Sequence, residues 1–267
     1  MPKSTRILRK ILLFINAASF SGLKHAARLA AITGHDEEAK AWNHEAETLQ
    51  QAWINAFDKE SGNERTYICS LWPDWIGQPI QSKFSEKALS NWNQVHDSVG
   101  DYKALPLWTY FDFASAHQWL FLQQPEYTWK TLEWFWQHQC SPGLYSWWEG
   151  NGEENSSGRW ANVRGWVHPK HVTPHYWTAA MALALQLDML AFLDDHGPEP
   201  VVVIGEGVKP EWLSQPMKVE GIRLHGNTIN WQWDGKALHV SVRGTKMKIK
   251  AGSPFGENAK IDIEYLN

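Results

Sequence analysis

The chain has 267 residues, with 25 Lys and Arg against 29 Asp and Glu, and its formal net charge is -4. A chain of this length can bury one substantial core and one smaller appended domain. No Lys/Arg-rich run is present, so the charge pattern argues against nucleic acid as a partner. Cys69 and Cys140 lack the paired spacing of a zinc site or a redox dithiol. Two cysteines do not indicate whether the protein works in a reducing or an oxidising compartment.

The N-terminal stretch has features of both a secretion signal and an amphipathic helix. Basic residues within 6–10 precede a short apolar run at 11–15, but Asn16 interrupts that run early. We therefore favour the helix. No stretch approaches the ~20 consecutive apolar residues that span a bilayer. The sequence predicts a soluble protein that is cytoplasmic rather than secreted and has no membrane partner.

Residues 23–58 predict a helical hairpin. Gly34 suits the position just beyond a helix C-terminus, and Asp36 suits the N-cap of the next helix. An apolar stripe at steps of three and four follows on the second helix, at Ala39, Trp42, Ala46, Leu49, Trp53 and Ala56. No second copy occurs at a fixed period, which argues against a tetratricopeptide-like solenoid.

The helical pattern fades between residues 58 and 106, where Gly and Pro become frequent. Long irregular connections often carry function, and Trp72 in this stretch is a candidate sugar contact. Helices resume over 106–119 and 125–138, each opened by a proline and together forming a second hairpin. The helix predicted over 174–194 is apolar on nearly every side, which is typical of a buried helix.

The period changes from helical to two near Gly197. Val201–Ile204 predicts a short buried strand, and the alternation on both sides of Asp234-Gly235 predicts a β-hairpin. Further alternation occurs at 247–249 and 261–265. We therefore predict two domains, a helical catalytic-type domain at 1–196 and a small antiparallel β-domain at 197–267.

The 18 tryptophans are the unusual feature of the composition. An indole ring stacks well on the C–H face of a sugar, although most tryptophans in helical proteins pack between helices. The loop at 143–176 joins several of them to acids, arginines and histidines, a composition that suits polyol binding. The candidate sugar contacts are Trp72, Trp147, Trp148, Glu153, Trp160, Arg164, Trp166, His168, His171 and His175.

Glu149 is the best candidate for a catalytic residue. Its neighbours Trp147 and Trp148 are expected to desolvate the carboxylate and raise its pKa. A surface acid without catalytic function is the alternative interpretation. Glycoside hydrolysis commonly uses two carboxylates, and the sequence offers one good candidate, with Glu153 as a secondary one.

The spacing of His168, His171 and His175 suggests a metal site as an alternative to sugar binding. Pro169 and Pro174 interrupt any shared helix, so the ligand faces are not preset and we expect no metal. We also expect no cofactor, because no phosphate-binding loop is present. A serine nucleophile elbow is absent as well.

Taken together, the hairpins, the Trp-Trp-Glu-Gly sequence at 147–150, the histidine-containing entry to a buried helix and the β-domain resemble a known family. They are similar to the C-terminal part of α-L-rhamnosidase-like enzymes among the six-hairpin, (α/α)6-barrel glycosidases. The resemblance implies a mainly α fold, a partial (α/α)6 barrel followed by a small C-terminal antiparallel β-domain. It also implies that Glu149 is the general base and that His168, His171 and His175 line the sugar site.

The resemblance is incomplete. A complete barrel needs six hairpins, and this chain offers roughly three of them. No residue here matches the general acid of the family. We therefore expect an inverting glycoside hydrolase that acts on carbohydrate, with a separate N-terminal half-barrel as a possible partner. The alternatives are a non-catalytic carbohydrate-binding or scaffold remnant and, ranked last, a terpene-cyclase-like barrel.

Overall fold

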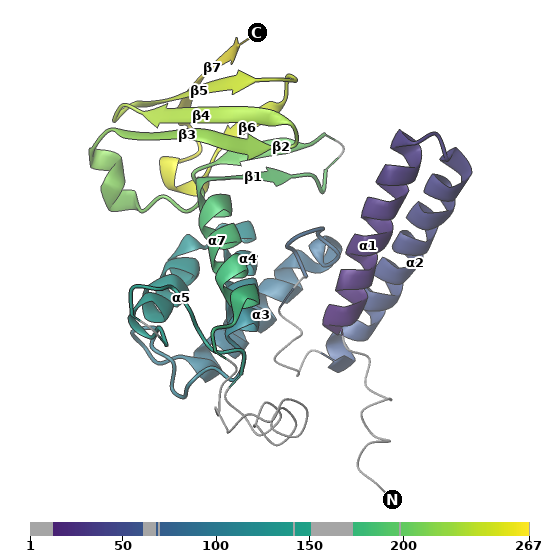
Figure 1. The fold of residues 1–267 in the computed structure, drawn as a ribbon, viewed down its shortest axis with the longest axis horizontal. Coiled ribbons are helices and arrows are strands. Elements are labelled where there is room, and N and C mark those ends of the chain that lie inside the picture. The colour runs from purple at the N-terminus through teal and green to yellow at the C-terminus, as the bar shows by residue number, and fades with distance from the viewer. Residues whose placement is uncertain are drawn as a thin grey trace, which may run out of the picture. The chain divides into compact units, whose positions relative to one another are not determined.

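The computed structural model describes residues 13–60, 68, 70–140, 142–150, 173–197 and 199–266. The chain divides into two compact units, residues 1–104 and 105–267. Along the chain, helices come first and strands follow (Figure 1). The predicted fold class, mainly helical with a small C-terminal β-domain, is confirmed. Within the described ranges, no helix is long and apolar enough to cross a membrane.

The first unit begins with the predicted helical hairpin, formed by α1 (Leu13–Ile32) and α2 (Asp36–Glu60). Gly34 has a φ of +81°, which a residue without a side chain adopts at low cost, and this conformation ends α1. The indole of the buried Trp53 donates a hydrogen bond to the carbonyl of Leu13 at 3.0 Å. The turn at Gly34 thus joins the two helices at one end, and the Trp53 indole on α2 joins α2 to the first residue of α1.

A further helix, α3 (Gln81–Val95), follows the 3-10 turn η4 (Gln78–Ile80). The expectation that residues 58–106 lack regular structure is therefore wrong for this part. Phe84, Ala88 and Trp92 recur at steps of four and are buried. The buried face has only one apolar side chain per turn, so the helical period is weak in the sequence.

The second unit contains α4 (Thr109–Phe121), α5 (Pro125–Gln137) and α7 (Tyr176–Leu190), and α4 packs against both other helices. Pro125 is the first residue of α5, as predicted. The side chains of the helical core are fully buried, among them Phe113, Leu120, Leu132, Phe135 and Leu185.

Helix α7 differs from its prediction in length and in burial. It ends at Leu190 rather than Asp194, because residues 191–194 leave the helix and pair with a strand. It is also not buried on all sides. Its buried residues are Thr178, Met181, Ala182, Leu185 and Met189, whereas Tyr176, Trp177, Leu183 and Leu187 are exposed. One apolar face of α7 is therefore open in this structure.

The β-domain consists of two sheets that enclose an apolar core (Figure 1). One sheet has the order β1-β2-β6, with β1 at Ala191–Asp194, β2 at Val201–Ile204 and β6 at Lys248–Ala251. The other has the order β3-β4-β5-β7, with β3 at Met217–Leu224, β4 at Asn227–Trp233, β5 at Ala237–Arg243 and β7 at Lys260–Leu266.

Most strand pairs are antiparallel, as predicted, and β4 and β5 form the hairpin expected at Asp234-Gly235. The pairs β2–β6 and β5–β7 are parallel, unlike the antiparallel pairing predicted for this domain. Parallel strands cannot be joined by a tight hairpin, so no turn sequence between them predicts the pairing.

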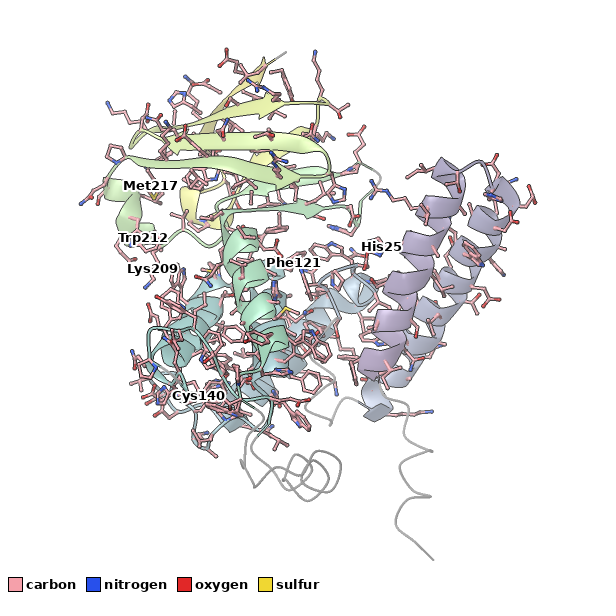
Figure 2. All side chains as sticks on the ribbon, in the orientation of Figure 1. His25, Phe121, Cys140, Lys209, Trp212 and Met217 are labelled. Carbon is pink, nitrogen blue, oxygen red and sulfur yellow. The ribbon has the colours of Figure 1, made fainter. Side chains whose placement is uncertain are left out.

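Residues 205–209 connect the β-domain to α5 and α7 through hydrogen bonds and an ion pair. The N–H groups of Gly205 and Gly207 donate to carbonyls at the end of α7, at 2.9 and 3.0 Å. The indole of Trp129 on α5 donates to the Gly207 carbonyl at 2.8 Å. Lys209 lies over the Trp129 ring at 4.5 Å and forms an ion pair with Glu133 of α5. Figure 2 labels Lys209 close to where the sheets meet the helices.

Candidate functional site

Glu149 lies where the loop after α5 passes the first residue of α4. Its carbonyl accepts the N–H of Thr109 at 3.3 Å, and the next residue, Gly150, forms a β-bridge with Trp108. The carbonyl of Trp147 accepts the N–H of His175, the residue before α7, at 3.0 Å. The backbone of Glu149 is therefore held between the N-terminal ends of α4 and α7.

Two buried indoles anchor this loop. Trp147 is 1% exposed, and its Nε1 donates to the Phe135 carbonyl on α5 at 2.7 Å. Trp148 is 7% exposed, and its Nε1 donates to the Pro106 carbonyl at 3.1 Å. Both rings are covered by protein and offer no open face to a ligand in this structure. They fix the backbone of Glu149 instead.

A chain of hydrogen bonds links the loop to α7 through two fully buried threonines. The Thr109 hydroxyl donates to the Trp148 carbonyl, Thr109 Oγ1 lies 2.9 Å from Thr178 Oγ1, and Thr178 Oγ1 lies 2.6 Å from His175 Nδ1. A carbonyl can only accept, so the Thr109 proton is used there and the Thr178 hydroxyl must donate to Thr109. His175 Nδ1 then carries the proton that it donates to Thr178.

This proton order leaves Nε2 as the acceptor nitrogen of a neutral His175. Burial lowers the pKa of His175 below its ordinary value, and the nearby Glu149 carboxylate offsets part of that effect by favouring the imidazolium. Glu149 itself is half-buried. The pair thus combines a carboxylate with an imidazole whose ring orientation is fixed by the buried threonines.

Aromatic side chains beside His175 remain accessible. Trp177 is 56% exposed. The centroid of its ring lies 4.0 Å from the ring centroid of Tyr110 on α4 and 6.1 Å from that of His175. Exposed, supported aromatic faces suit stacking on a sugar ring. Tyr110 and Trp177 were not among the residues predicted for the site. Both lie on predicted helices, where most tryptophans were expected to pack between helices.

The structure brings together only some of the residues predicted for the site. Trp147, Trp148, Glu149 and His175 meet at the ends of α4 and α7, as described above. Trp72 belongs to the unit 1–104. The predicted contacts that lie outside the described residues are Glu153, Trp160, Arg164, Trp166, His168 and His171.

Where the structure describes side chains, no group of three or more His, Cys, Asp or Glu residues could hold a metal ion. His175 is the one member of the histidine series inside the described residues, and its Nδ1 is bonded to Thr178.

Comparisons with known proteins give a structural likeness and no sequence match. No protein-family model matches the chain, and no curated protein matches it. Among solved structures, a GH78 family rhamnosidase of Bacillus sp. GL1 is similar, with a TM-score of 0.55 and 12% sequence identity. The match covers 96% of this chain and 27% of the rhamnosidase. This likeness supports a glycosidase-like fold, and the chain spans about a quarter of the length of that protein.

Proposed function

We propose that the chain carries part of a glycoside hydrolase site, in which Glu149 is the general base of an inverting reaction. The observation that carries the proposal is the backbone of Glu149 held at the N-terminal ends of α4 and α7, where buried threonines orient the His175 imidazole. The fold likeness to a rhamnosidase supports the same reaction class.

In this mechanism Glu149 removes a proton from a water molecule that attacks the anomeric carbon. His175 offers Nε2 as an acceptor to a sugar hydroxyl, because Nδ1–H is engaged with Thr178. Trp177, supported by Tyr110, supplies an apolar face for the sugar ring. The predicted contacts at 153–171 would complete the subsite.

The acid that protonates the leaving group is unassigned in this chain. We propose that a further half-barrel of helices provides it. The open apolar face of α7, with Leu183 59% and Leu187 50% exposed, supports such a partner. Contiguous apolar surface of this kind commonly marks a protein contact.

A second candidate function is carbohydrate binding without catalysis. It is favoured by the observation that the matched part of the rhamnosidase is only 27% of that chain. The two candidates share the sugar site and differ in turnover.

The test compares three forms of the full chain, wild type, Glu149→Gln and the control Glu126→Gln, which removes an exposed carboxylate on α5. The substrates are 4-nitrophenyl glycosides, beginning with the α-L-rhamnoside, because 4-nitrophenolate leaves without protonation and turnover then needs the general base but not the separate acid. Binding of the free sugars is measured by calorimetry. We expect Glu149→Gln to lower kcat by about 10²–10⁴-fold with binding retained, since this is the usual contribution of a general base. Glu126→Gln should leave both unchanged.

Equal turnover in Glu149→Gln and wild type would refute the general base. Sugar binding without hydrolysis in any form would favour the non-catalytic candidate, and absence of both binding and hydrolysis would exclude the two candidates together.

A further inference from the structure

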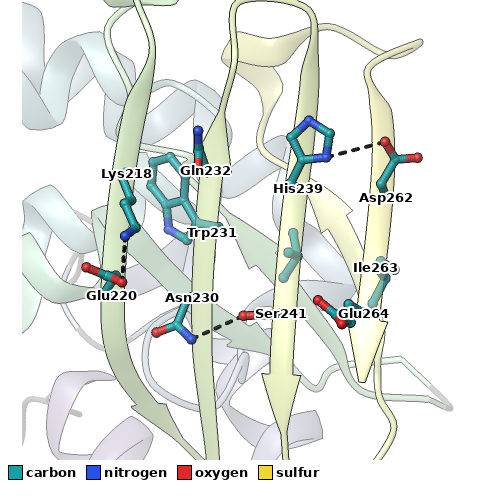
Figure 3. A pocket seen from close by; sticks show the side chains of 11 residues that line it. Lys218, Glu220, Asn230, Trp231, Gln232, His239, Ser241, Asp262, Ile263 and Glu264 are labelled. Atoms are coloured by element: carbon teal, nitrogen blue, oxygen red, sulfur yellow. Dashed lines mark hydrogen bonds and ion pairs between the residues drawn. The ribbon is translucent and has the colours of Figure 1, made fainter. Parts of the chain in front are cut away.

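A concave surface lies on the β-domain, apart from Glu149. A groove of about 420 Å³ crosses the outer face of the β3-β4-β5-β7 sheet (Figure 3). Its volume falls within the roughly 300–1,000 Å³ of small-molecule sites. The strand register places Asn230, Ser241 and Glu264 in one row on this face, with Gln232, His239 and Asp262 in the row beside it.

The floor of the groove is built from short side chains in fixed orientations. Asn230 Oδ1 accepts the N–H of Gly221 at 2.7 Å, and Asn230 Nδ2 donates to Ser241 Oγ at 3.1 Å. Gly221 has a φ of +79° and lies in a β-bulge of β3, which turns its N–H toward Asn230. Because Ser241 Oγ accepts from Asn230, its own proton is available to a ligand in the groove.

Longer side chains form the walls, and they are mainly acidic. Glu220 on β3 pairs with Lys218 at 2.8 Å. On β7, Asp262 lies 3.4 Å from His239 Nδ1, and Glu264 lines the same wall. Three carboxylates line the groove with one ammonium group, and the ammonium of Lys260, outside the lining, lies 3.1 Å from Asp262, so negative charge is in excess. This charge disfavours anionic ligands such as phosphates or acidic sugars.

We infer that this groove is a second carbohydrate site, one that binds a neutral sugar. Carboxylate acceptors at the walls and the hydroxyl and amide groups at the floor match the vicinal hydroxyls of a sugar. The choice of sugar among neutral polar ligands rests on the proposed function of the helical unit. The groove itself, its floor and its charge do not depend on that function.

The test is residue-resolved amide NMR of the full chain, titrated with L-rhamnose, D-glucose, D-galactose and, as the anionic comparison, D-glucuronate. We expect at least one neutral sugar to shift the amides of Asn230 and Ser241, and D-glucuronate to bind more weakly. The amide of His175 reports the proposed active site in the same spectra, so the two sites are read separately.

Two groove variants and two controls sharpen the test. Ser241→Trp fills the floor and should weaken binding at the groove by at least tenfold. Glu264→Gln is a smaller change that keeps the test valid where the Trp side chain disturbs the sheet, and it should weaken binding several-fold. Glu257→Gln removes an exposed carboxylate of the same domain outside the groove, and Glu149→Gln alters the other site. Both controls should leave groove binding unchanged.

Shifts at His175 without shifts at Asn230 and Ser241 would overturn the groove site and leave the function proposed for Glu149 standing. Tighter binding of D-glucuronate than of the neutral sugars would overturn it too, as would groove binding that survives both groove variants.

Discussion

The side chains around Glu149 show how roles are divided between neighbouring residues. Trp147 and Trp148 flank Glu149 in the sequence, but their indoles donate to carbonyls of the interior and hold the loop. The accessible aromatic ring belongs to Trp177 on another element. The flanking tryptophans therefore hold the loop of Glu149, and the exposed indole of Trp177 belongs to a residue distant in sequence.

The protonation of His175 gives a prediction at this scale. We expect its imidazole to titrate below the ordinary pKa of 6.5, because burial disfavours the imidazolium. Glu149→Gln removes the carboxylate that favours the imidazolium, so the pKa should fall further. NMR titration of the His175 ring protons between about pH 4 and 8 measures both values.

The lowered pKa of His175 also determines the direction in which folding stability changes with pH. The unfolded chain binds this proton more tightly than the folded chain does, so the histidine costs stability as the pH falls from about 6.5 through the lowered pKa. Glu126→Gln is the control and should leave the titration unchanged. A His175 pKa above 6.5, or one that Glu149→Gln raises, would contradict the assigned pairing.

Helix α7 is apolar on nearly every side, yet it has one buried face and one exposed face. Leu185 is 0% exposed, and Leu187, two residues along the same helix, is 50% exposed. Residues two apart lie on different faces of an α-helix, so the burial follows the helical period even where hydrophobicity does not.

This difference predicts unequal costs for the same substitution. Leu185→Ala should lower the free energy of unfolding by about 2–5 kcal/mol, because it leaves a cavity in the core. Leu187→Ala should change it by less than about 1 kcal/mol, because half of that side chain is already in water. Urea unfolding of both variants measures the two values, and equal losses would show that Leu187 is covered in solution.

The molecule as a whole consists of two compact units, and each described unit has its own buried side chains. Within residues 105–267, the helical core and the β-domain are joined by the backbone bonds of Gly205 and Gly207 and by the Lys209–Glu133 ion pair. The candidate active site and the groove both lie inside this unit.

We therefore expect a fragment of residues 105–267 to fold without the first unit. It should keep the far-UV circular dichroism of mixed helix and strand, and it should unfold cooperatively with heat. The fragment of residues 1–104 provides the comparison, with a helical spectrum expected from α1, α2 and α3. Loss of cooperative unfolding in the 105–267 fragment would show that its core depends on the other unit.

Local features of the sequence determined a large part of the secondary structure. The glycine at 34 ends a helix, the proline at 125 begins one, and Asp234-Gly235 turns the β-hairpin. These signals work because they act over a few residues, through backbone dihedral angles and alternating side chains. The local density of polar and aromatic residues also predicted a site in the loop of Glu149, and that site stays a prediction.

Only the tertiary structure decided which groups face one another. The contact between Thr109 and Thr178 joins residues 69 apart in the sequence, and the Trp148 indole reaches a carbonyl 42 residues away. The parallel pair β5–β7, the open face of α7 and the polar groove arise in the same way. Hydrophobic periodicity specifies that a face is buried, but the partner that buries it depends on how distant segments pack together.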